Sequence, residues 1–396
     1  MFSGRSHFKQ LPNPLFMLLR SRQKEGKEVI DLTDSNPTQC RFTYPSFWIK
    51  ALSKNANFIY EPNPNGNFNA RMSVVEYYRE LGAEVNPGQV FFASGTSEAY
   101  HFLFSLLMNP GDHLLVPAPG YPLMESLGIL NDISIDSYHQ EFDGMRWKID
   151  FDSLQRLIGP RTGAIMLVHP NNPTGSYIDR KDQVRLVSLA KKNRLPIIAD
   201  EVFYDYIYPE MQILPRSFAT QNQTLVFTLN GLSKMACLPQ LKLSWILITG
   251  PKRLVREAAR RLEMIADAYL SVNTPVQNAI GFYLDGRFKI QSQVLHRILK
   301  NRAYLAKALK ERLPEGDILN SEGGWYVTIR LPSVMSDEQW AILLLKKEGV
   351  LVYPGHFFDF PTESCLVLSL LPPEPLFREG IEKIISRVSY SLSIIG

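Results

Sequence analysis

The chain has 396 residues, of which 45% are hydrophobic and 21% charged, and these fractions exclude a disordered, fibrous or coiled-coil protein. Its 43 Lys and Arg against 39 Asp and Glu leave a net charge of +4, spread evenly along the sequence. So slight an excess argues against nucleic acid or an anionic membrane as a partner. We therefore expect small-molecule partners, and two domains or one large α/β unit.

The three cysteines are far apart and show no CxxC spacing, so we expect reduced thiols, no disulfide framework and no metal site. The apolar patch at 15–19 is too short to span a bilayer and has no small-residue cleavage site behind it. No other apolar run approaches the roughly 20 residues that a spanning helix needs. The sequence thus predicts a cytoplasmic protein.

Strand-like and helix-like segments alternate between about residues 70 and 270, which is typical of a mostly parallel sheet flanked by helices. Helical periodicity covers 97–107, 180–192 and 253–269. Several strand candidates are nearly continuous apolar runs, which favours burial on both faces. The seven expected strands are 90–93, 113–116, 133–137, 164–168, 196–199, 225–228 and 241–248.

The pattern changes after Pro275 to that of a smaller α+β unit. A long basic amphipathic helix over 290–313 precedes a strand at 325–330, a helix at 337–347, two short strands and a final helix from Leu376. The first 50 residues have few regular signals and read as an arm that joins this unit. We expect a large domain over 51–285 and a smaller domain made of 1–50 and 286–396.

Ligands of a doubly wound sheet bind at the loops that follow its strands, and four short polar segments follow strand candidates here. Each has a purely structural alternative, as a helix N-cap, a turn or a carboxylate cap. The lysine of the last segment has apolar neighbours, which would lower its pKa and favour the nucleophilic neutral amine. The segments are Ser94-Gly95-Thr96-Ser97, HPNNPTG at 169–175, Asp200-Glu201-Val202-Phe203 and Gly231-Leu232-Ser233-Lys234.

Together, in this order and at these separations, the four segments resemble the fold-type I, pyridoxal-phosphate-dependent aminotransferases of class I and II. The resemblance extends from Tyr60 over nearly the whole chain. It implies that Lys234 forms the Schiff base with the cofactor and then shuttles the substrate proton. It also implies that Asp200 pairs with the pyridine nitrogen of pyridoxal 5'-phosphate and that Asn172 bonds the ring 3'-oxygen.

The same resemblance places the cofactor phosphate on the amides and hydroxyls of Gly95, Thr96 and Ser97, because helix N-terminal donors suit a dianion. Tyr121 would stack on the ring, with ordinary aromatic packing as the alternative. Tyr60 resembles the tyrosine that reaches the phosphate from a neighbouring subunit, and a structural tyrosine is the alternative. The first reading of Tyr60 implies an obligate homodimer.

Two departures from the family concern the cofactor. The phosphate-binding arginine eight positions after the lysine is Lys242 here, which supplies charge without the planar fork. The tyrosine three positions after the aspartate is Phe203, and the adjacent Tyr204 would point the other way on a strand. Asn172 is then the only expected donor to the ring 3'-oxygen, and the pKa of the lysine-bound cofactor should be raised.

A third departure concerns the substrate. The strand that normally carries the carboxylate-binding arginine reads CLVLSL at 365–370, with Val367 in the arginine's place. Either another cation, for which Arg330 is the candidate, holds the carboxylate, or the substrate is not bound as a conventional α-amino acid. Ser35 stands where the family's carboxylate-contacting loop usually has glycine.

The resemblance predicts a transaminase that moves an amino group from an amino acid or amine to a 2-keto acid by a ping-pong route. A pyridoxal-phosphate-dependent lyase or decarboxylase on the same fold is the alternative enzyme. A non-catalytic ligand-sensing module is a third reading, against which stands the complete set of Lys234, Asp200 and Asn172. The sequence names neither the donor nor the acceptor.

Overall fold

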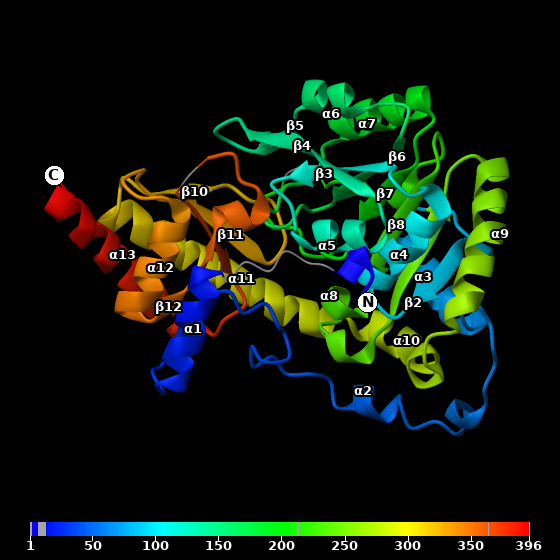
Figure 1. Ribbon diagram of the computed structural model, residues 1–396. Coiled ribbons are helices and arrows are strands. Elements are labelled where there is room, and N and C mark those ends of the chain that lie inside the picture. The colour runs from blue at the N-terminus through cyan, green and yellow to red at the C-terminus, as the bar shows by residue number, and fades with distance from the viewer. Residues whose placement is uncertain (1, 7–12, 212–213, 363, 396) are drawn as a thin grey trace.

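The central feature of the computed structural model, which describes residues 2–6, 13–211, 214–362 and 364–395, is an eight-stranded sheet (Figure 1). Five strands, β3, β4, β6, β7 and β8, are parallel, while β9 runs antiparallel between β2 and β8, and β5 antiparallel to β4. The spatial order is β2 (Val90–Ala93), β9 (Ser244–Thr249), β8 (Val226–Gly231), β7 (Ile197–Asp200), β6 (Thr162–Val168), β3 (His113–Ala118), β4 (Ser134–Phe142), β5 (Trp147–Ile149).

All seven expected strands are present, but the described sheet has eight, so the expected number was wrong by one. The additional strand, β5, has three residues that alternate between buried and exposed. A segment so short does not give the apolar run by which the others were identified. The last strand also begins later than expected, because residues Pro239–Leu241 form a 3₁₀ turn before β9.

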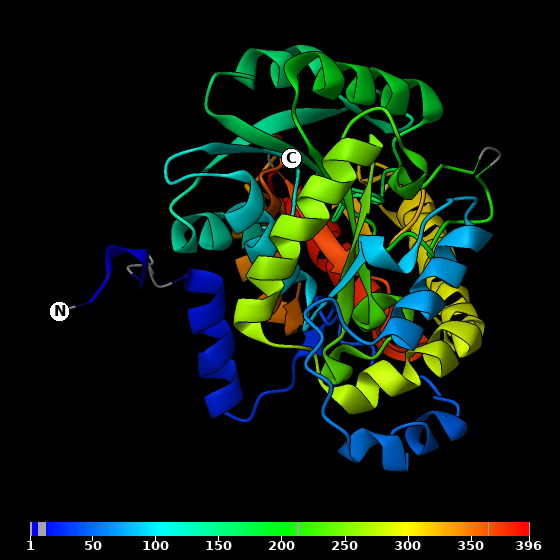
Figure 2. The ribbon, with the colours of Figure 1, turned by 90° about the vertical axis from the view of Figure 1, so that its right-hand side faces the viewer.

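Alternation along the buried strands directs successive side chains to two helical layers. Leu114 and Met166 pack with α4 (Thr96–Leu107), α5 (Leu123–Leu130) and α9 (Lys252–Tyr269), the last of which crosses in front of the sheet in Figure 2. Leu115 and Ile165 pack on the other face with α6 (Phe151–Leu157) and α7 (Arg180–Asn193). The sheet is therefore buried on both faces, as its apolar strands predict.

A smaller antiparallel sheet lies to one side of the large one (Figure 1), in the order β10 (Asp317–Leu319), β11 (Tyr326–Arg330), β14 (Cys365–Ser369), β13 (Tyr353–Pro354). Three helices of the C-terminal part accompany it: α11 (Phe288–Arg312), α12 (Asp337–Glu348) and α13 (Glu374–Ile395). The expected fold class, a large mostly parallel sheet flanked by helices with a smaller α+β unit, is confirmed.

The N-terminal arm joins this smaller unit. Its strand β1 (Ile30–Asp31) pairs with β12 (Val350–Leu351) in parallel, and α1 (Pro14–Lys24) packs against α12. The remaining helices are α2 (Phe47–Lys50), α3 (Phe68–Glu80), α8 (Leu232–Met235) and α10 (Thr274–Gly286). The exact domain limits, 51–285 against 1–50 with 286–396, stay a prediction.

No helix in the described ranges combines the length and the apolar character needed to cross a membrane. Among the same residues, no group of three or more His, Cys, Asp or Glu side chains is arranged to hold a metal ion.

Candidate active site

The loops at the carboxyl edge of the large sheet surround a cavity of about 460 Å³. Parallel strands end at the same edge, so segments that are distant in sequence meet there. Side chains from the N-terminal arm and from the smaller sheet complete the wall. The cavity brings together nine candidate residues: Ser35, Gly95, Thr96, Ser97, Tyr121, Asn172, Asp200, Lys234 and Lys242.

Lys234 lies on the short helix α8, directly after β8. Burial lowers the pKa of its ammonium group, while Cys237 and Asp200 act in the opposite direction. Its Nζ lies 5.0 Å from the Trp325 ring centroid and 5.6 Å from that of Phe203, and the Tyr206 hydroxyl donates to its backbone carbonyl at 2.8 Å. Aromatic walls thus hold an amine that is easier to deprotonate than an exposed lysine.

Asp200 is the last residue of β7 and is buried at the cavity wall. Its Oδ2 accepts from the Tyr100 hydroxyl at 2.5 Å and its Oδ1 from the Val202 amide at 3.0 Å. Desolvation raises the pKa of this carboxyl group, and both hydrogen bonds and the Lys234 charge oppose the rise. A carboxylate in this setting is poised to pair with a cationic group of a ligand.

The N-terminus of α4 supplies donors at another part of the wall. Gly95 caps the helix without a side-chain hydrogen bond, and Thr96 and Ser97 form its first turn. Lys242 belongs to the same corner, because Ser244, two residues later, pairs with Ala93 at the end of β2. Free helix amides, hydroxyls and one ammonium group together suit a phosphate.

The turn at 171–175 presents Asn172 to the cavity. The Thr174 hydroxyl donates to Asn171 Oδ1 at 2.9 Å, and the Asn171 side-chain Nδ2 donates to the Pro119 carbonyl at 3.2 Å. Gly175 has φ +68°, and a Cβ there would lie 2.4 Å from the Gly323 carbonyl oxygen. Asn172 is 8% exposed and its Oδ1 has no partner among the described residues, so the fixed turn leaves this amide to a ligand.

The segment after Asp200 is a turn and not the strand that was expected around Tyr204. The amide of Tyr204 donates to the Glu201 carbonyl at 3.0 Å, which closes this turn, and its hydroxyl donates to the Pro215 carbonyl at 2.8 Å. Phe203 lines the cavity instead. Tyr204 therefore directs its hydroxyl to the Pro215 segment, for a reason other than strand alternation.

Three residues singled out from the sequence do not line the cavity. Tyr60 is 65% exposed, and Val367 is fully buried in β14. Arg330 is exposed and ion-pairs with Asp317 at 3.1 Å. Since a strand rises about 3.3 Å per residue, Arg330 lies roughly 13 Å along β11 from Tyr326, which does line the cavity. The expected substrate-binding role of Arg330 is not supported by this position.

Several wall residues were missed by sequence reasoning. Tyr100 follows Thr96 by one helical turn, a spacing that places both on one face of α4 and could have identified it. Tyr326 shares a face of β11 with Arg330, so alternation alone could not choose between them. Asp359 and Glu125 also line the cavity, and neither belongs to a sequence pattern that we could recognise.

Comparison with known proteins agrees with this geometry. The family model described as aminotransferase class I and II matches residues 27–384. The chain is 29% identical to the glutamate-pyruvate aminotransferase AlaA of Haemophilus influenzae over 91% of each chain, and 28% identical to the alanine aminotransferase of Mycobacterium bovis over 95% of this chain and 89% of that one. The structure of an alanine aminotransferase from Pyrococcus furiosus superposes with a TM-score of 0.90 at 24% identity, covering 98% and 100% of the two chains.

The family resemblance inferred from the four loop segments is confirmed, and with it the expectation that the chain is an enzyme of amino transfer. The match extends over the large sheet, the smaller sheet and most of the N-terminal arm. This chain belongs to the class I and II aminotransferase family.

Proposed function

We propose that this aminotransferase binds pyridoxal 5'-phosphate in the cavity at the carboxyl edge of the large sheet, with Lys234 as the residue that bonds to it. The observation that carries the proposal is the meeting of three features in one cavity: a lysine with a lowered pKa, a buried carboxylate, and the free N-terminus of α4. Members of the family are pyridoxal-phosphate enzymes, which supports the same assignment.

The residues present fit this cofactor. Lys242 and the amides and hydroxyls of Gly95, Thr96 and Ser97 would hold the phosphate. The amide group of Asn172, whose Oδ1 has no partner among the described residues, would turn to the ring 3'-oxygen. When bound, pyridoxal phosphate supplies an aldehyde and an electron-accepting ring.

The side chains then have separable tasks. Asp200, buried and already bonded to the Tyr100 hydroxyl, would keep a proton on the pyridine nitrogen through its negative charge. Lys234, released from the cofactor, would act at Nζ as the base that takes the substrate proton and returns it. Tyr121, which is half exposed at the mouth, would cover the ring.

The proposed reaction moves an amino group from an amino acid or amine to a 2-keto acid, each substrate using the same cavity in turn. The named relatives act on alanine and on glutamate with pyruvate, which supports small amino and keto acids as the first compounds to test. A lyase or decarboxylase reaction remains the alternative, and release of ammonia and pyruvate by a lyase, or of carbon dioxide by a decarboxylase, without an acceptor would reveal it.

The purified protein should be yellow, and borohydride should fix the cofactor to the peptide that contains Lys234. K234A should lose the covalent label and lower turnover on the order of 10⁴-fold, while K252A, at the exposed start of α9, should retain both. Mass spectrometry of the reduced peptide identifies the site. A protein that takes up no added pyridoxal phosphate contradicts the proposal.

We further propose that two copies form the working enzyme and that Tyr60 contributes to the partner's phosphate site. The segment around it carries several exposed apolar side chains, as expected of a face that is covered in an assembly. They are Ile49 at 73%, Phe58 at 93%, Ile59 at 60%, Tyr60 at 65% and Phe68 at 56% exposure.

Mixed dimers test this arrangement. If K234A and Y60A chains are unfolded together and refolded, each mixed dimer holds one site with both native residues. Because half of the dimers are mixed and each has one intact site, about a quarter of the wild-type activity should return. Chains that stay monomeric, or mixtures no more active than their components, contradict a shared site. A cytoplasmic location stays a prediction.

A further inference from the structure

The described part of the cavity wall supplies two cations, Lys234 and Lys242, and the proposed function gives each of them a task. Lys234 bonds to the cofactor, and Lys242 lies beside the phosphate-binding start of α4. No arginine of the described residues lines this cavity. A substrate carboxylate would therefore find no free cation in this chain, although a buried carboxylate needs one or several charge-assisted donors.

The face of the smaller sheet next to the cavity is uncharged for several residues. Tyr326 lines the cavity, and Thr328 shares its face of β11 because side chains alternate along a strand. Val367 lies opposite Thr328 on β14, and Tyr353 lies opposite Val367 on β13, so these three form one row, on the same face of the sheet as Tyr326. At the position central to this row, the fully buried Val367 provides only methyl groups.

The polar side chains around this row are hydroxyl groups and a carboxylate, not cations. The Ser35 side chain lies close to the Tyr326 hydroxyl, and the Thr33 side chain lies close to that of Tyr353. Burial raises the pKa of both tyrosines, and Asp34 lies close enough to raise each further. The hydroxyls can donate or accept hydrogen bonds but carry no positive charge, and the carboxylate repels a second negative charge.

Asp359 adds a second carboxylate to the wall, from the loop that follows β13. Its loop is fixed to the other side of the cavity, because the Gly120 amide donates to the Phe358 carbonyl at 2.9 Å. Burial raises the pKa of the Asp359 carboxyl group. The substrate half of the cavity thus combines hydroxyls with acids.

We propose that the specific substrate of this cavity has no carboxylate on the carbon that bears its amino group, and is an amine with a hydroxyl or similar neutral polar substituent. This inference rests on the proposed function. Tyr326 and Ser35 would bind the substituent, and Asp34 and Asp359 would discriminate against the corresponding amino acid. In the reverse half-reaction the partner compound is an aldehyde or ketone.

Pairs of compounds that differ only by the carboxylate test the proposal in the wild-type holoenzyme. Suitable pairs are serine with ethanolamine and homoserine with 3-amino-1-propanol. The rate at which each compound converts the lysine-bound cofactor to pyridoxamine phosphate is measured in single turnover. We expect the amine of at least one pair to react 10-fold or more faster, since an unpaired carboxylate costs about that factor or more. Faster reaction of the amino acid in every pair overturns the inference.

Binding provides a second readout that does not depend on turnover. V367R should gain affinity for propionate, seen as a rise in melting temperature with added propionate, whereas wild type and V367M should show none. V367M, a neutral side chain of comparable length, controls for the change in volume. If wild type binds propionate as strongly as V367R, another group holds the carboxylate and the inference fails. The wild-type pairs decide the question even if V367R does not fold.

The two proposals fail in different ways. A chain that takes up no pyridoxal phosphate refutes the proposed function. A chain that takes it up, forms pyridoxamine phosphate and prefers amino acids refutes only the substrate inference.

Discussion

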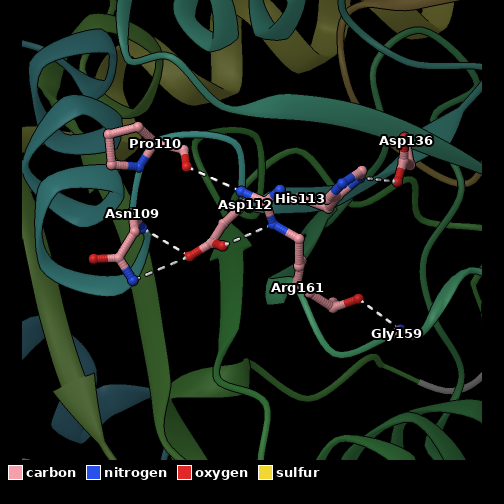
Figure 3. Close-up of polar contacts among 8 residues, drawn as sticks. Asn109, Pro110, Asp112, His113, Asp136, Gly159 and Arg161 are labelled. Atoms are coloured by element: carbon pink, nitrogen blue, oxygen red, sulfur yellow. Dashed lines mark hydrogen bonds and ion pairs between the residues drawn. The ribbon is translucent and has the colours of Figure 1, made fainter.

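Both edges of the large sheet carry polar residues but use them differently. At the amino edge, where β3 and β6 begin, Asp112 pairs with Arg161 and the His113 ring pairs with Asp136 (Figure 3). At the carboxyl edge, Asn172 and Asn230 keep buried side-chain atoms without partners among the described residues. Since buried polar atoms are normally paired, the unpartnered Asn172 Oδ1 at the cavity wall marks a place for a ligand.

The polar side chains of this amino-edge group all have partners within it or in the neighbouring backbone. Asp112 Oδ2 accepts from the Asn109 amide at 2.8 Å, its Oδ1 lies 3.6 Å from Arg161 Nε, and Arg161 donates to the Pro110 carbonyl at 3.1 Å. His113 Nδ1 lies 2.7 Å from Asp136 Oδ2. The hydrogen bond from the Asn109 amide is the largest cause of the lowered pKa of Asp112. Here a carboxylate favours the folded state when it is ionised.

The carboxyl edge shows the opposite electrostatics. Burial raises the pKa of Asp200, and that of its neighbour Glu201 to about 8. These carboxyl groups oppose folding when ionised without a ligand. The comparison teaches that hydrogen-bond donors outweigh burial at Asp112, whereas burial outweighs the donors at Asp200 and leaves its carboxylate to be compensated by a ligand.

The largest expected effect follows from removing one carboxylate at each edge. D200N should lower kcat/KM by about 10²–10³-fold, because the charge that holds the pyridine proton is lost. D112N should leave kcat/KM unchanged and lower the melting temperature. Steady-state kinetics and thermal unfolding of both variants decide this, and an equal loss of activity in both contradicts the comparison.

The second prediction concerns pH. Glu201 accepts from the Ser217 hydroxyl at 2.6 Å and from the Phe218 amide at 2.7 Å, yet its pKa is about 8 in the folded chain. The folded state holds the proton more tightly than the unfolded chain, so the stability from this group is complete below pH 4.5 and is lost as pH rises through 8.

E201Q should therefore flatten the dependence of unfolding free energy on pH between 5 and 8. Urea titrations at several pH values measure this slope. E263Q, on the exposed side of α9, should keep the wild-type slope. An unchanged slope in E201Q would show that Glu201 does not govern stability in this range.

The third prediction uses two glycines with almost the same conformation. Gly111 has φ +79° and Gly82 has φ +78°, but a Cβ at Gly111 would lie 2.4 Å from Arg161 Nη2, while nothing lies within 4 Å at Gly82. G82A should cost about 1 kcal/mol from the backbone alone. G111A should cost about 0.5–1 kcal/mol more, since Arg161 must give up its contacts.

Denaturant unfolding of these two variants, with activity assays on each, tests the third prediction. Activity should be retained in both, because neither glycine lies at the cavity. Equal costs would show that the Arg161 contacts at the amino edge contribute nothing to stability.

The smallest expected effect is spectroscopic. F203Y would place a hydroxyl at the cavity wall as a second donor to the ring 3'-oxygen, and should lower the pKa of the lysine-bound cofactor by about 1 unit. Absorbance titration of the holoenzyme measures it. Y204F, which loses a hydroxyl bonded to Pro215 outside the cavity, is the control and should titrate as wild type.

The strands and the main loops could be predicted because buried apolar runs and polar turns are local properties of the sequence. Lys234, Asp200 and Asn172 were found because they end or follow such runs. The cavity wall contributed by the smaller sheet was not found. Which residue of β11 reaches the cavity depends on where the two sheets meet, and local alternation carries no information on that distance.

Very short strands show a second limit of what sequence patterns can predict. β5 has three residues and β1 and β12 have two each, too few to give a recognisable pattern, and the pairing of β1 with β12 joins segments about 320 residues apart. Asp359 illustrates the same point, because only the contact between Gly120 and Phe358 brings its loop to the cavity. Such residues become visible only when tertiary contacts are known.

The pairing of Ile30 with Val350 has a consequence for how the chain folds as it is made. At synthesis rates of 5–20 residues per second, roughly 15–60 s separate the appearance of these two partners. The apolar side chains of Leu15 and Leu32 are fully buried in the folded chain. During this interval the core that buries them has not yet been synthesised. We expect the large sheet to form first on the ribosome, and the N-terminal arm to require protection from aggregation until translation ends.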